Sequence, residues 1–534
     1  MVSAVQPFRT VSSSVVVSAL RLALSLWLVA GIPTVVTAAG DTRLADAAMN
    51  GDRAAVRALL ADKASPTLDV NLPGSDGSPA LHWAVRRGDL ETAKLLIAAG
   101  ADVKRPNRLG LAPLPIAAGI GSPAMLRMLL DAGADPNATD PTGETALMIA
   151  SRVGVLDAVQ VLIDRGASVD QREDAFQQTA LMFAVRENHG PVVKLLLAKG
   201  ASINAKTRVG QTPNWVLPNS VPGFGHGVGI VRGGLPARGS RAPIPGALSP
   251  LHYAARDGRV EIAAILVDAG ADINIRDAND ITPLISSIVN NRPQVARLLV
   301  DRGADITAAD WYGRTPLWAA IETRNMDVDN GSFDNSIDRA PHLELIKTLL
   351  AKGADPNVRM KEVPPVRRAF LRATGDLSWV DMTGQTPFLR AALAGDVTVM
   401  RLLLQHKADP HIGTFAGTSP LMIAAGVNWV FSQTYDEGQA ARLEAVKLCH
   451  ELGMDVNQVN SMGLTALMGA ANNGSDDIIR FLVEKGAKLD PKDKEGRSAL
   501  TWAEGVFLAT HPARPKPSSI ALLKELMAKA GINQ

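Results

Sequence analysis

Short apolar segments with helical periodicity return along nearly the whole chain, and turn sequences separate them. In residues 76–102, "DGSPALHWAVRRGDLETAKLLIAAGAD", a turn leads into one apolar segment, Gly88 interrupts the pattern, and a second apolar segment follows. The spacing of the apolar positions predicts two helices. Gly100 is expected to end the second helix in the left-handed conformation that glycine adopts at little cost. Because helices this short are marginal in water alone, we expect consecutive pairs to stack and bury their apolar faces.

The glycine that ends each unit recurs at a nearly constant interval. Spacings of 33, 33 and 34 residues separate Gly100, Gly133, Gly166 and Gly200, and the interval of 33 returns from Gly270 to Gly303 and from Gly453 to Gly486. A fixed period of this length is typical of a repeat array, in which each unit touches only its neighbours.

The start of the first helix carries a second recurring pattern. "TALMIA" at 145–150, "SPLHYA" at 249–254 and "TPLWAA" at 315–320 approach the signature T-P-L-H-x-A that accompanies a period of 33. The sequence therefore resembles the ankyrin repeat family from about residue 41 to residue 534. The resemblance implies an all-α fold, an α-solenoid of about twelve ankyrin repeats, each a helix-turn-helix with a β-turn finger. It also implies that partners bind the concave surface and the fingers.

The first forty residues differ from the rest. Arg9 and Arg21 are their only charges, an apolar run from Leu22 to Ala30 follows, and small residues close the segment. This pattern predicts a signal peptide over residues 1–39, and an uncleaved anchor is the alternative. We expect a periplasmic or secreted protein, with no stable membrane span once the signal is removed. The Ala- and Arg-rich composition favours a bacterial source.

Charge and motifs exclude several classes of function. The chain has 55 basic and 53 acidic residues, and removal of Arg9 and Arg21 leaves 53 of each, unlike a globally basic nucleic-acid binder. A single cysteine, Cys449, excludes a disulfide framework and a zinc site built on several thiolates. No hydrolase, P-loop or metalloprotease motif is present. We therefore expect no enzyme activity, no cofactor and no metal.

Four methionines share one position of the signature, and we interpret them as core residues that fill gaps in the packing. They are Met148, Met182, Met422 and Met468.

Departures from the period locate insertions in the array, which spans residues 41–534. They fall near 214–247, 325–341, 359–381, 427–441 and 505–517. The first has eight Gly and five Pro among 34 residues and carries Arg232, Arg238 and Arg241. The insertion at 359–381 carries Arg367 and Arg368. In the ankyrin resemblance both lie on the finger side, where either a binding role or a neutral insertion is possible. Residues 325–338 are acidic and fall at the opposite end of a repeat.

Four arginines share one position in the predicted first helix, two residues before the middle of the repeat. They are Arg86, Arg152, Arg186 and Arg256. In the ankyrin resemblance this position faces the inner groove, so the arginines could form a ladder that binds carboxylates or phosphates. The alternative is local pairing with Asp89, Glu187 and Asp257. The aromatic residues Trp311, Tyr312 and Phe415 are further candidates on the fingers.

These observations favour an exported scaffold, adaptor or inhibitor that binds a macromolecular partner on its concave and finger surface. We expect a protein partner with an acidic surface, no nucleic acid, and a monomeric chain. A cell-envelope element that binds an anionic polymer is the alternative. An enzyme with a site beneath residues 214–247 is a third hypothesis, which needs two groups with shifted pKa values in a cleft.

Overall fold

The computed structural model describes residues 41–62, 68–210, 245–325, 339–362, 380–428, 438–506 and 513–532. The predicted signal peptide, residues 1–39, lies outside these ranges and stays a prediction. Most residues of the five predicted insertions lie outside them as well.

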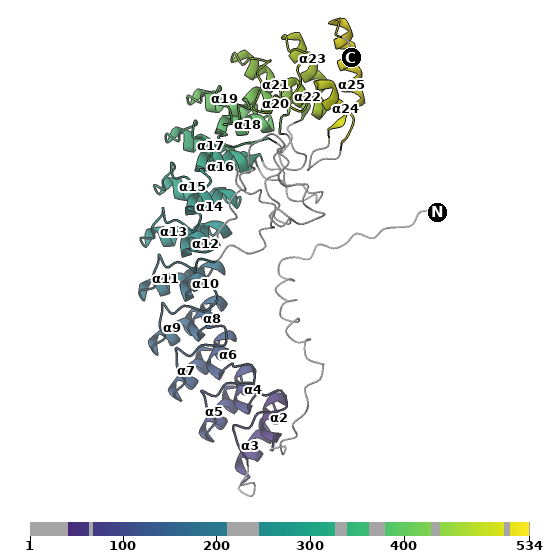
Figure 1. The fold of residues 1–534 in the computed structure, drawn as a ribbon. Helices are drawn as coiled ribbons and strands as arrows, with labels where there is room; N and C mark the ends of the chain where they lie inside the picture. Colours follow the sequence, from purple (N-terminus) through teal and green to yellow (C-terminus); the bar gives the residue numbers. More distant parts are fainter. Residues whose placement is uncertain are drawn as a thin grey trace, which may run out of the picture.

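The described residues form a curved stack of 24 helices in two rows (Figure 1). Even-numbered helices line the inner, concave side of the arc, and odd-numbered helices form its outer side. Each inner helix packs against the inner helices before and after it and against its own outer helix. Twelve helix pairs result, and the described residues contain no strand, only the isolated bridges Pro73–Pro79 and Thr139–Thr145. The predicted all-α solenoid of about twelve repeats is confirmed.

The helices are short and regular in length. The inner row consists of α2 (Arg43–Asn50), α4 (Ala80–Arg86), α6 (Pro113–Gly119), α8 (Ala146–Val153), α10 (Ala180–Arg186), α12 (Pro250–Asp257), α14 (Pro283–Val289), α16 (Pro316–Arg324), α18 (Pro387–Ala394), α20 (Pro420–Ala425), α22 (Ala466–Asn473) and α24 (Ala499–Gly505). The outer row consists of α3 (Arg53–Ala61), α5 (Leu90–Ala98), α7 (Pro123–Asp131), α9 (Leu156–Asp164), α11 (Gly190–Ala198), α13 (Val260–Asp268), α15 (Pro293–Asp301), α17 (Arg339–Ala351), α19 (Val397–Gln405), α21 (Gln439–Glu451), α23 (Asp476–Glu484) and α25 (Pro517–Lys529).

Helix ends follow from local side-chain and backbone chemistry. The Thr145 hydroxyl accepts a hydrogen bond from the Met148 N–H at 3.3 Å and caps α8. Several other inner helices begin with such a Thr or Ser cap. After α5, Gly100 has φ 91°, so the predicted left-handed ending is confirmed. In the ninth repeat Lys407 takes this position with φ 67°, a conformation that costs a side-chain-bearing residue about 1–2 kcal/mol.

One apolar core runs through the whole stack, from Leu44 to Met527. The methionines that share a signature position are between 0% and 2% exposed, which confirms their assignment to the core: Met148, Met182, Met422 and Met468. At the C-terminal end, α25 buries Leu523 and exposes Lys524 and Glu525. A polar outer face on the last unit is what a stack with no further neighbour requires.

Hydrogen bonds between consecutive repeats fix the register of the stack. In the outer loops, the Asn137 side chain donates to the Gly166 carbonyl at 3.0 Å and accepts from the Ser168 N–H at 2.7 Å. In the fingers, the Trp311 N–H donates to the Asn279 carbonyl at 3.0 Å. Equivalent bonds recur along the array, so the inner surface is preorganised.

At two of the insertions, the described residues on either side are bonded to each other, and we call these paired residues necks. The Gly210 N–H donates to the Pro245 carbonyl at 2.7 Å across residues 211–244. Arg339 Nη2 donates to Asn325 Oδ1 at 2.8 Å across residues 326–338. Each neck returns the chain to the repeat at the point where it left. The period therefore resumes after these two insertions.

Within the described ranges, no helix combines the length and the apolar character that a membrane span needs.

Candidate interaction surface

Four inner helices place an arginine at the same position of the repeat, in their last turn. These are α4 with Arg86, α8 with Arg152, α10 with Arg186 and α12 with Arg256. A cation at this end of a helix interacts favourably with the exposed carbonyls. The helices that carry these arginines belong to the row that lines the concave side of the arc (Figure 1).

Aromatic rings alternate with the arginines. The Arg86 guanidinium lies 5.5 Å from the centre of the Trp83 ring, and the Arg152 guanidinium lies 5.2 Å from that of Phe183 in the next repeat. The Tyr253 ring has Arg186 at 5.7 Å and Arg256 at 4.9 Å. These distances are within the range of cation–π contacts. Phe183 thus links an arginine of α8 to α10, and Tyr253 links the arginines of α10 and α12, so the guanidinium groups of repeats 4 to 6 follow one another from helix to helix. We call Arg152, Arg186, Arg256 and these two rings the row.

The arginines differ in their acidic partners. Arg152 makes a bidentate pair with Glu144, with both N–O distances at 2.7 Å. Arg256 pairs with Asp257 at 2.8 and 3.2 Å, as the local-pairing interpretation expects. Arg186 instead donates to the neutral amide oxygen of Gln178 at 3.1 Å.

The remaining proposed local partners behave differently from the expectation. Asp89 accepts a hydrogen bond from Arg53 at 2.7 Å rather than from Arg86. The structure records no bond between Glu187 and Arg186 among the described residues. Among the described residues, the central arginine of the row, Arg186, therefore has a hydrogen bond to a neutral amide and no recorded ion pair with a carboxylate.

Tyr253 is neutral and anchors the row. Burial raises the pKa of Tyr253, and the neighbouring charges of Arg186 and Arg256 offset only part of this effect. Its hydroxyl accepts a hydrogen bond from Gln178 Nε2 at 3.1 Å. For Arg256, burial lowers the pKa, but the hydrogen bond to Asp257 and the charge of Asp257 together raise it further, so the net shift of the pKa is upward. The stack of Arg186, Tyr253 and Arg256 thus carries fixed positive charge around a neutral ring.

Two fingers beside this row expose apolar side chains that the sequence analysis missed. Phe176 is 63% exposed and Val209 is 54% exposed. The Arg208 N–H donates to the Phe176 carbonyl at 2.8 Å, so the fingers of repeats 5 and 6 are adjacent. An apolar residue at the tip of a predicted turn is the signal that could have identified both.

The proposed finger aromatics take different positions. Tyr312 is only 3% exposed and packs with Trp318 and Met360, so it belongs to the core and this part of the expectation needs correction. Trp311 meets the Tyr312 ring edge-on with centroids 5.3 Å apart and is partly buried. Phe415 is 62% exposed, and the Arg359 guanidinium lies 4.0 Å from its ring centre.

The proposed arginines of the insertions, Arg232, Arg238, Arg241, Arg367 and Arg368, lie outside the described residues. Their part in binding stays a prediction.

The basic row ends after α12. Val289 in α14 and Glu322 in α16 take the positions equivalent to Arg256. At the eighth repeat Glu322 pairs with the buried Arg314 at 3.4 Å. The position that carries arginine in α8, α10 and α12 therefore carries an apolar residue in α14 and an acidic one in α16.

Family models for ankyrin repeats match most of the array. One model, of three ankyrin repeats, matches residues 21–107, 114–207, 251–360 and 438–505, and a single-repeat model matches residues 383–412. Together they cover more than half of the chain. The chain belongs to the ankyrin repeat family. Ankyrin repeats typically serve as scaffolds for protein–protein interaction and are generally not enzymes.

Individual relatives share parts of the array. Ankyrin repeat domain-containing protein 63 of Homo sapiens is 30% identical over 166 residues, which are 31% of this chain and 38% of that protein. Notch-regulated ankyrin repeat-containing protein of Xenopus laevis is 40% identical over 73 residues, 14% of this chain and 64% of the relative. The chain thus spans less than two thirds of the length of these curated relatives. The crystal structure of the ankyrin repeat domain of Bcl-3 matches with a TM-score of 0.36 and 26% identity, over 46% of this chain and 95% of that one.

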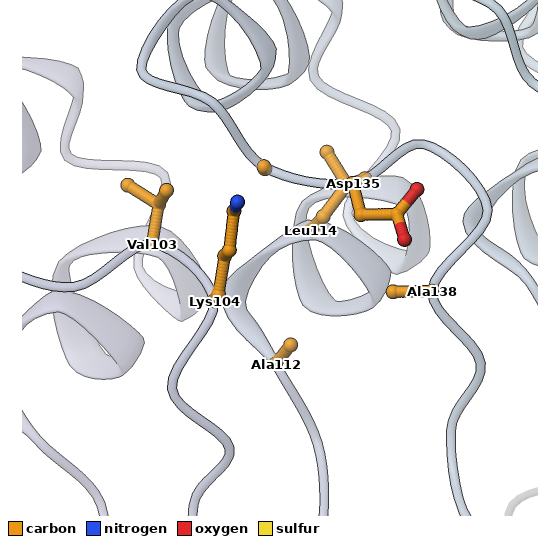
Figure 2. A pocket seen from close by; sticks show the side chains of 7 residues that line it. Val103, Lys104, Ala112, Leu114, Asp135 and Ala138 are labelled. Carbon is orange, nitrogen blue, oxygen red and sulfur yellow. The ribbon is translucent and has the colours of Figure 1, made fainter.

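A pocket lies between α6 and the loops that follow α5 and α7 of the ankyrin array (Figure 2). Its volume of about 200 Å³ is below the usual range of ligand pockets. Lys104 and Asp135 are the charged residues around it, among small apolar side chains. No group of three or more His, Cys, Asp or Glu residues in the described ranges is placed to hold a metal ion. The extended inner surface is thus a stronger candidate for binding than this pocket.

Proposed function

We propose that this ankyrin repeat protein is an exported bacterial scaffold, adaptor or inhibitor that acts in the periplasm or outside the cell. In this proposal it binds an acidic protein partner on its concave and finger surface. The observation that carries the proposal is the row of arginines and aromatic rings in repeats 4 to 6. The apolar run at residues 22–30, with small residues after it, supports export.

Electrostatics explains why an acidic partner fits. The chain is nearly neutral as a whole, yet Arg86, Arg152, Arg186 and Arg256 gather on one face. A concave surface lined by one sign of charge attracts the opposite charge and speeds association, and salt weakens this attraction. Replacing Arg152, Arg186 and Arg256 together by Ala is expected to slow association and flatten its salt dependence without changing the helix content.

A protein fits this surface better than an anionic polymer. The exposed side chains of Phe176 and Val209 lie beside the row, and a polyanion offers nothing to bury them. A partner that combines carboxylates with apolar side chains satisfies both parts of the surface. Competition by a polyanion of the cell envelope distinguishes the two ligands.

Site-specific photo-cross-linking in the native cell tests the proposal. A photoreactive phenylalanine analogue at Arg86 probes the inner row, and the same analogue at Arg127, which is exposed on the outer helix α7, is the matched control. We expect one discrete cross-linked protein from Arg86 and none from Arg127. Equal labelling from both positions, or labelling of polymer alone, contradicts the scaffold proposal. N-terminal sequencing of the native protein tests export, with a start near Ala39 as the expected result.

A further inference from the structure

The arginines of repeats 4 to 6 recur at the spacing of the repeats themselves. Helices α8, α10 and α12 are consecutive neighbours in the inner row. Packed helices lie about 8–10 Å apart. Arg152, Arg186 and Arg256 occupy equivalent places on these three helices, so they mark intervals of about 10 Å along the groove.

This interval matches one kind of peptide backbone. A helix rises about 1.5 Å per residue, so seven residues span about 10 Å and return to the same face after two turns. An extended strand covers the same distance in about three residues, but its third residue points to the opposite face. A helix that lies along the groove can therefore present one acidic side chain to each arginine, whereas a strand cannot.

The apolar fingertips lie on one side of this path. Arg186 Nη1 bonds to Gln178, and Phe176 stands two residues earlier in the same finger. Val209 belongs to the adjacent finger, which is joined to the first by the bond from Arg208 to Phe176. A ligand over the arginines thus has an apolar surface beside it.

We propose that repeats 4 to 6 bind an amphipathic helix of the partner, with acidic residues seven positions apart over Arg152, Arg186 and Arg256. Apolar residues on the neighbouring face of that helix pack against Phe176 and Val209. The inference rests on the proposed function and adds the conformation and the spacing of the ligand.

The three arginines do not contribute equally. Glu144 pairs with Arg152 and Asp257 pairs with Arg256. In the described part of the chain, the recorded contacts of the Arg186 guanidinium are with the neutral amide of Gln178 and the ring of Tyr253. The central acidic residue of the ligand therefore meets the one arginine of repeats 4 to 6 for which the described residues supply no ion-pair partner. Removing that residue is expected to weaken binding more than removing either of the outer two.

The test uses the full chain and synthetic helical peptides labelled for fluorescence anisotropy. One peptide carries three Glu residues at every seventh position beside a Leu face, and a control of the same composition carries them at every fifth position. We expect the first to bind about tenfold more tightly at about 50 mM salt, and the advantage to shrink at about 300 mM. Loss of the central Glu is expected to cost more affinity than loss of a terminal one.

Charge reversal on the protein completes the test. Arg186→Glu is expected to weaken the heptad peptide about tenfold, while Arg127→Glu on the outer row changes its affinity less than twofold. Equal thermal melting of the two variants excludes a folding defect. The inference is overturned if the two helical peptides bind equally or if neither binds. It is also overturned if a proline-rich peptide with Glu at every third position binds as tightly as the peptide with Glu at every seventh position. Cross-linking from Arg86 still decides the scaffold proposal separately.

Discussion

Asp396→Ala is expected to weaken the junction between the eighth and ninth repeats, so that the repeats on its two sides unfold separately. Asp396 begins α19 and is 2% exposed. Its carboxylate accepts from Arg324 Nε at 2.9 Å and from Arg339 Nη2 at 3.3 Å, and it caps α19 through the Val399 N–H at 3.2 Å. One buried carboxylate therefore joins α16, α17 and α19.

The expected loss of stability follows from the buried arginine that Asp396→Ala leaves without its carboxylate partner. Removing one partner of a buried ion pair costs about 3–5 kcal/mol, because the other charge stays buried without compensation. The Arg324 side chain is 9% exposed and stays in that position. By contrast, Asp301 pairs with Arg297 at the surface, where both side chains are more than half exposed, so Asp301→Ala is expected to cost less than about 0.5 kcal/mol.

Urea unfolding followed by circular dichroism, with hydrogen exchange of α16 and α19, provides the assay. In a linear array the loss falls on one junction, so we expect the Asp396→Ala transition to broaden or separate into two steps. Asp396→Asn, which retains a good cap, is expected to show most of the same loss. If Asp396→Ala unfolds in one step at the midpoint of Asp301→Ala, the carboxylate does not couple these repeats.

Three further substitutions test local features. Burial lowers the pKa of His252 to about 4, whereas a histidine of the unfolded chain has a pKa near 6.5. Between these two pH values the unfolded state binds more protons than the folded state, so the stability falls as the pH falls from about 6.5 to about 4. His252→Met is expected to flatten the melting temperature between pH 7 and pH 4, and an unchanged slope contradicts this assignment. Lys407→Gly is expected to stabilise the fold by about 1 kcal/mol, because glycine adopts the positive φ of this position at little cost. Lys407→Ala keeps a side chain at this φ and is the neutral control. A lower melting temperature for Lys407→Gly contradicts this prediction. Gly246→Ala places a methyl group against the Arg208 carbonyl oxygen, so hydrogen exchange near Thr207 is expected to rise. Gly496→Ala is the control, because Gly496 also has a positive φ but has open space around it. Equal exchange in the two variants argues against a tight neck.

The sequence predicts the architecture well because the repeat imposes one local pattern many times. The glycine at the end of most second helices and the hydroxyl cap of most first helices are local signals, and they are found where the period places them. The inner position of Arg152 and its equivalents follows from the same register.

The partners of those arginines could not be predicted in the same way. Glu144 reaches Arg152 from the finger of the same repeat, so this contact depends on how the finger folds against the helix. Phe183 reaches Arg152 from the next repeat, so that contact depends on the stacking geometry. Tyr312 looks like an exposed finger residue in the sequence, yet it is packed with Met360, which is distant in the chain. Phe176 and Val209 lie on adjacent fingers because a backbone hydrogen bond joins these fingers, and this bond could not be predicted from the sequence.

Because of the necks, the length of an inserted loop has little effect on the stability of the array. The cost of closing a flexible loop grows only with the logarithm of its length, about 0.6 kcal/mol for each doubling. Because Gly210 and Pro245 are already bonded, material can be added to or removed from residues 211–244 without a change in the neighbouring repeats. Selection can thus lengthen, shorten or rewrite the sequence next to the basic row while the core stays the same. New binding specificities can arise at this edge at little risk to the fold.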